Sequence, residues 1–155
     1  MSQLVALATW LGLTVTRRAA ARIVLGLPAT MAHELAHWTV ALLVGSRPGL
    51  PSFWPRREQD QWVLGSVAFR PRPLTAGAVA LAPLWCFAPA VAWLLSSDAA
   101  FENVFQQAVK GVLAGYLAVA AIPSAQDWLI AARYPVGSSV VVAAMVLGAR
   151  AALGA

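Results

Sequence analysis

The chain is poor in charge, in histidine and in cysteine. Only 11% of its 155 residues are charged, whereas a soluble domain usually carries about 25%. The single cysteine, Cys86, excludes an intrachain disulfide and any motif built on paired thiols. With two histidines and six acidic residues, a polar site must be assembled from very few side chains, so its members can be sought by elimination.

Hydrophobic residues make up 60% of the chain, and this composition predicts an all-α integral membrane protein. The length allows four to five transmembrane helices of about 20 residues with short loops, and no separate soluble domain. We therefore expect a single polytopic membrane domain over residues 1–155. The net charge of +5 comes mostly from arginines in loops, which reports membrane topology more than nucleic-acid binding.

Five apolar segments are candidate spans: Leu4–Val15, Ile23–Gly45, Leu74–Leu95, Val104–Ile122 and Val136–Leu153. The first is short, so a full span, a re-entrant segment and an interfacial helix all stay open. The polar loop Ser46–Pro73 contains a β-prone stretch at 62–69, for which Gly65-Ser66 is the expected turn of a small hairpin. The alternative is an ordinary interfacial loop anchored by tryptophans.

Both histidines belong to one motif, His33-Glu34-Leu35-Ala36-His37. Positions i and i+4 share a helix face, so both imidazoles can bind one metal ion. Glu34 flanks this pair, where a general base must lie to act on water whose pKa zinc lowers to about 7. A chance occurrence would place three polar side chains in an otherwise uncharged apolar helix, which is costly. The motif predicts zinc-dependent hydrolysis.

Catalytic zinc usually has three protein ligands, and the third must here be a carboxylate because no other histidine exists. Glu34 is reserved as the base. Four further acids lie in a charged loop or on the opposite membrane side: Glu58, Asp60, Asp98 and Glu102. Asp127 remains, just after the helix break at Pro123 and on the His37 side. The alternative role for Asp127 is an interfacial helix cap.

These features resemble the site-2 protease family of intramembrane zinc metalloproteases over about residues 20–130. The resemblance implies that His33, His37 and Asp127 bind Zn²⁺ and that Glu34 is the catalytic base. It also implies cleavage of transmembrane protein substrates, known as regulated intramembrane proteolysis, and a β-hairpin or sheet after the metal-binding helix, which the stretch 62–69 resembles.

The run before Asp127 departs from the Asn-Pro-Asp-Gly-like pattern common in that family. Without the asparagine, Ser124 or Gln126 is the candidate to stabilise the oxyanion. The strand formed by Val67, Ala68 and Phe69 is the candidate to hold an unwound substrate by β-addition.

Two other functions use the same residues. One is a non-proteolytic zinc-binding membrane adaptor or pseudoprotease that captures substrates. The other is a metal-ion transporter, which is disfavoured because a transporter usually offers several sites along a path and this chain has suitable acids at only one level. Replacing Glu34 separates protease from adaptor, because an adaptor does not need the base.

The distribution of arginine predicts the orientation. The Ser46–Pro73 loop holds five arginines and Arg133 falls on the same side, whereas the Ser96–Asn103 loop is acidic. The positive-inside rule places the arginine-rich side in the cytoplasm. We expect a protein of the cytoplasmic membrane with its active site towards the cytoplasm.

Cysteine labelling tests this orientation. In a Cys86→Ala background, a cysteine introduced at position 58 should react with a membrane-impermeant reagent only after the membrane is opened, because the rule places it inside. Labelling of position 58 in intact cells would overturn the orientation.

Overall fold

A computed structural model describes residues 1–15, 19–58, 61–95 and 103–153. Three acidic residues considered above lie outside these ranges, namely Asp60, Asp98 and Glu102. Apart from Asn103, the predicted acidic loop Ser96–Asn103 also lies outside the described residues.

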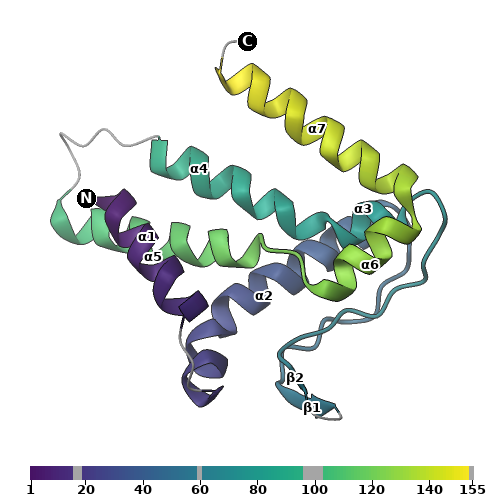
Figure 1. Ribbon diagram of the computed structural model, residues 1–155, viewed down its shortest axis with the longest axis horizontal. Coiled ribbons are helices and arrows are strands. Elements are labelled where there is room, and N and C mark those ends of the chain that lie inside the picture. The colour runs from purple at the N-terminus through teal and green to yellow at the C-terminus, as the bar shows by residue number, and fades with distance from the viewer. Residues whose placement is uncertain (16–18, 59–60, 96–102, 154–155) are drawn as a thin grey trace.

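The described residues are mostly helical, as predicted (Figure 1). The elements in chain order are α1 (Ser2–Val15), α2 (Ala19–Leu43), β1 (Arg56–Glu58), β2 (Gln61–Val63), α3 (Ala76–Ala80), the 3-10 helix η1 (Ala82–Cys86), α4 (Phe87–Leu95), α5 (Val104–Ala120), α6 (Ala125–Arg133) and α7 (Pro135–Leu153). Helix α2 lies against α5 and η1, while α3 packs against α6 and α7. The far end of α7 extends away from the other helices, and the two strands lie at the opposite end.

Four of the five apolar segments correspond to single helices, α1, α2, α5 and α7, whereas Leu74–Leu95, also an expected span, is not one continuous helix. That segment divides into α3, η1 and α4. The break lies at Pro83, which has no backbone N–H and cannot continue the hydrogen-bond ladder of α3. Pro89 is tolerated because it lies in the first turn of α4, where backbone N–H groups have no helical partner.

By length and apolar composition, none of the described helices could cross a membrane alone. Helices α5 and α6, bent by 51° at the break between them, pass the same criterion as a pair.

A small antiparallel hairpin is present, but the prediction that Gly65-Ser66 forms its turn is wrong. The hairpin pairs β1 with β2, Arg56 opposite Val63, so the turn precedes β2. Ser66 instead pairs with Ser52 through two backbone hydrogen bonds of 2.9 and 3.0 Å. This bridge makes the chain after β2 antiparallel to the segment that leaves α2. Gly65 packs against α2 and does not form a turn.

Helix α1 approaches α5 closely through Gly111 and Gly115. A Cβ atom at Gly115 would lie 2.7 Å from Thr9 Cβ and 2.9 Å from Ala6 O. Small residues four apart let two helix backbones come together, as in membrane helix pairs. A separate buried cluster of Ala80, Leu81, Ala131 and Val141 joins α3, α6 and α7.

The Gly115→Ala substitution tests the α1–α5 contact. It should lower the free energy of unfolding by about 1–3 kcal/mol, because the methyl group has no space and overpacking forces the helices apart. Thermal unfolding of the purified protein measures the effect. The matched control is Gly148→Ala in α7, where a Cβ atom meets nothing within 4 Å. This control should be neutral or stabilising through helix propensity, and equal behaviour of the two variants would contradict the contact.

Candidate metal centre

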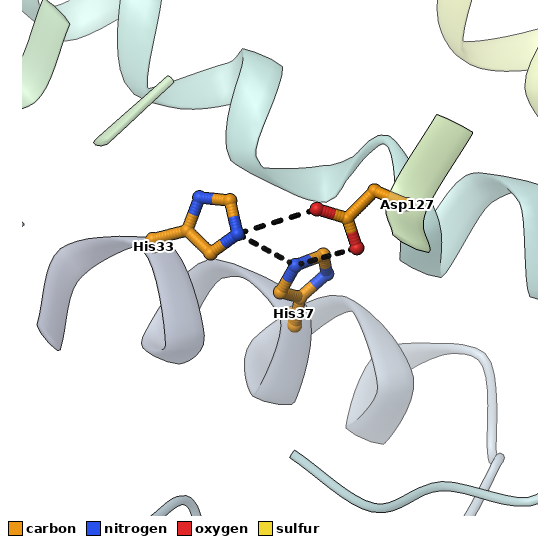
Figure 2. Close-up of side chains that lie close together, drawn as sticks. All are labelled: His33, His37 and Asp127. Atoms are coloured by element: carbon orange, nitrogen blue, oxygen red, sulfur yellow. Dashed lines mark hydrogen bonds and ion pairs between the residues drawn. The ribbon is translucent and has the colours of Figure 1, made fainter. Parts of the chain in front are cut away.

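Three side chains from two helices converge on one point (Figure 2). His33 and His37, one turn apart on α2, place their Nε2 atoms 3.1 Å from each other. From α6, Asp127 places Oδ2 3.4 Å from His33 Nε2 and Oδ1 3.3 Å from His37 Nε2. His37 and Asp127 are buried. The structure thus brings together the three residues that the sequence singled out as metal ligands, and the cluster could hold a metal ion.

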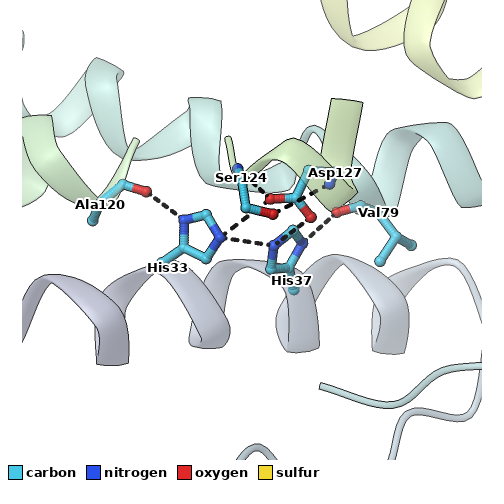
Figure 3. A network of polar contacts seen from close by, with 6 residues as sticks. All are labelled: His33, His37, Val79, Ala120, Ser124 and Asp127. Carbon is cyan, nitrogen blue, oxygen red and sulfur yellow. Dashed lines mark hydrogen bonds and ion pairs between the residues drawn. The ribbon is translucent and has the colours of Figure 1, made fainter. Parts of the chain in front are cut away.

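Backbone carbonyls determine the tautomer of both imidazoles (Figure 3). His33 Nδ1 lies 2.8 Å from Ala120 O, and His37 Nδ1 lies 2.7 Å from Val79 O. A carbonyl oxygen only accepts hydrogen bonds, so each Nδ1 must carry the proton and donate. In the neutral form of each ring, Nε2 then presents a lone pair to the centre of the cluster. Such outer hydrogen bonds are the usual way in which metal-binding histidines are oriented.

The cluster fits a divalent metal ion. With both rings neutral, two Nε2 lone pairs and a carboxylate face one another, and a divalent cation between them would satisfy all three donors. Ligand atoms about 2.0–2.1 Å from a tetrahedral zinc ion are about 3.3–3.4 Å apart, by simple geometry. The observed separations of 3.1, 3.3 and 3.4 Å are close to this spacing. Two imidazoles and one carboxylate are also a common ligand set of catalytic zinc.

Asp127 is placed by the first turn of α6. Ser124 is the N-cap: its backbone N–H donates to Asp127 Oδ2 at 2.7 Å, and Asp127 N–H donates to Ser124 Oγ at 3.2 Å. This capping box holds the carboxylate with one edge towards its own helix and both oxygens near the imidazoles. Asp127 therefore belongs both to the capping box of α6 and to the candidate ligand set. Ser124, a predicted oxyanion residue, serves as a helix cap.

Glu34 is buried beside the histidines, and Gly65 packs directly against it. A Cβ atom at Gly65 would lie 2.7 Å from Glu34 Cγ and 2.8 Å from Thr30 Cγ2. Only a glycine allows the chain after β2 to pass so near this carboxyl group. Gly65 and the Glu34 side chain thus lie against each other on the wall of one cavity.

The cluster opens onto a cavity of about 840 Å³. Most of the predicted site residues line it, namely His33, Glu34, His37, Val67, Phe69, Ser124, Gln126 and Asp127. Ala68 is not among the lining residues, and its carbonyl accepts the N–H of Gly49 at 2.8 Å. Gln126 is exposed at the cavity, on the first turn of α6.

The sequence analysis did not identify the backbone of Val79 and Ala120 or the contact made by Gly65. The carbonyl groups act independently of their side chains, so residue type carries no signal for them. Gly65 attracted attention only as a turn residue.

No protein-family model matches the chain, and neither a curated protein nor a solved structure shows significant similarity to it.

Substitution of the histidines tests the metal centre. His33→Ala and His37→Ala should each lose the roughly stoichiometric zinc expected of the purified protein, because two remaining ligands cannot hold the ion. Elemental analysis measures the content. Gln126→Ala, which changes the same cavity without removing a predicted ligand, is the control and should keep its zinc. Full zinc occupancy in both histidine variants would rule the site out.

Proposed function

We propose that the protein is an intramembrane zinc metalloprotease, similar to site-2 proteases, that hydrolyses peptide bonds of membrane-embedded substrates. One observation carries the proposal: the cluster of His33, His37 and Asp127 shares a large cavity with the buried carboxyl group of Glu34. A metal site with three protein donors, an adjacent base and an open space is the arrangement that metal-dependent hydrolysis needs.

The apolar surface supports a location in the membrane. Large hydrophobic side chains on several helices are more than 60% exposed, including Leu4, Leu95, Val104, Phe105, Val140 and Leu147. Soluble monomers rarely expose so much apolar surface, whereas lipid covers it without cost. In this setting the polar cluster lies within protein around a cavity, as polar groups at membrane depth require.

The reaction needs a base, a metal ion and a held substrate. When bound by His33, His37 and Asp127, zinc supplies Lewis acidity that polarises the scissile carbonyl and acidifies water. Glu34 takes a proton from the attacking water and passes it to the leaving amine. Gly65 lies against the Glu34 side chain and lines the same cavity. Gln126, exposed on the cavity wall, is the better-placed candidate to donate to the oxyanion, since Ser124 caps α6.

The segment after Gly65 forms a single bridge at Ser66 and no regular strand over 67–69, in contrast to the predicted strand, but it offers an edge to a substrate. Ser66 and Ala68 direct their backbone groups to the segment that follows α2. Backbone groups alternate sides along a strand, so those of Val67 and Phe69 point the other way, and they form no backbone hydrogen bond with any described residue. Both residues line the cavity. An unwound substrate segment adds to this edge as a further strand, which brings its backbone into the cavity.

The Glu34→Gln substitution tests the chemistry. Glutamine keeps the size of the side chain but accepts no proton at neutral pH, so cleavage should fall by about 10²–10⁴-fold while zinc content stays unchanged. The assay is cleavage of a single-span membrane protein in detergent, with zinc measured in parallel. Asp127→Ala is the contrasting variant and should lose zinc as well.

Cleavage by Glu34→Gln at the wild-type rate would show that Glu34 is not the base. A wild-type protein that binds zinc and membrane helices but cleaves no substrate would instead support the adaptor or pseudoprotease.

A further inference from the structure

The carbonyl of Val79 can accept a hydrogen bond from His37 because the residue four positions later is a proline. In an α-helix the carbonyl of residue i accepts the N–H of residue i+4, which for Val79 is Pro83, a residue without an N–H. The cap of α3 supplies one backbone N–H to Val79 O. A carbonyl oxygen has two lone pairs, and the second accepts His37 Nδ1–H at 2.7 Å.

A related arrangement, with the proline three residues later instead of four, occurs at the other histidine. Ala120 is the last residue of α5, and its donors in a continuing helix would be the N–H groups three and four residues later. Pro123 has none, and the N–H of Ser124 is committed to Asp127 Oδ2 at 2.7 Å. The carbonyl of Ala120 accordingly accepts His33 Nδ1–H at 2.8 Å.

We propose that Pro83 and Pro123 are positioning residues of the metal centre: each withholds a backbone N–H and thereby reserves a helix-end carbonyl for one histidine. The inference rests on the proposed zinc site and adds to it the residues that orient its imidazoles. Metal-binding histidines usually need a hydrogen-bond acceptor for the second ring nitrogen, frequently a carboxylate. A chain with six acidic residues obtains both acceptors from broken helices, which adds no further charge to an apolar interior.

Restoring the missing N–H groups tests the proposal. Pro83→Ala and Pro123→Ala each introduce a donor that competes with a histidine for its carbonyl. Loss of such outer partners typically weakens metal binding 10–100-fold, and that weakening is expected for zinc, measured by competition with a chelator on the full-length protein. The absorption spectrum of bound Co²⁺ should also change, because it reports the geometry of the ligands and not the stability of the fold.

Pro89→Ala in α4 is the matched control. It also exchanges a helical proline for alanine, but Pro89 precedes neither histidine acceptor and is exposed, so zinc affinity should stay at the wild-type value. Pro83 is fully buried whereas Pro123 is only partly so, and Pro123→Ala therefore keeps the test valid if Pro83→Ala does not fold.

Wild-type affinity in both Pro83→Ala and Pro123→Ala, or equal weakening in Pro89→Ala, would overturn the inference and leave the zinc site standing. Absence of zinc binding by the wild-type protein would overturn the proposed function together with it.

Discussion

The candidate site depends on the convergence of two imidazoles and a carboxylate on one point. Their nitrogen and oxygen atoms lie within 3.1–3.4 Å, and both rings donate through Nδ1, so in its neutral form each ring has a lone pair on Nε2. A cation bound there would link α2 to α6 through these side chains. The elements around the cluster serve the same arrangement: α2 supplies the histidines, the break after α5 supplies Asp127, and the break after α3 supplies a carbonyl.

The metal cluster was the most predictable part of the molecule. The spacing of His33 and His37 is a property of one helix, so the sequence determines their common face. Asp127 lies ninety residues away, and only the scarcity of acids in this chain allowed it to be found by elimination. Its two predicted roles, ligand and helix cap, are compatible, because the carboxylate accepts the Ser124 N–H and still faces both imidazoles. Contacts such as those between Asp127 and the imidazoles become visible only in the three-dimensional arrangement of α2 and α6.

The helix break at Pro83 and the register of the loop were not predicted. Apolar composition over Leu74–Leu95 suggested one long helix, but composition is insensitive to a missing backbone N–H. Glycine at position 65 is compatible with both a turn and a close backbone approach, and only the long-range contact with Glu34 selects the second. Short-range sequence patterns thus predicted the candidate histidine ligands, whereas the shape of the cavity around them depends on contacts between distant segments.

Zinc binding by two imidazoles and a carboxylate of this cluster is the property on which the proposed activity depends. X-ray absorption at the zinc edge of the wild-type protein, purified without added metal, tests it most directly. The account predicts nitrogen and oxygen neighbours at about 2.0–2.1 Å, two of them imidazoles, and no sulfur. A metal-free protein, or a zinc–sulfur distance of about 2.3 Å indicating Cys86 as a ligand, would contradict it.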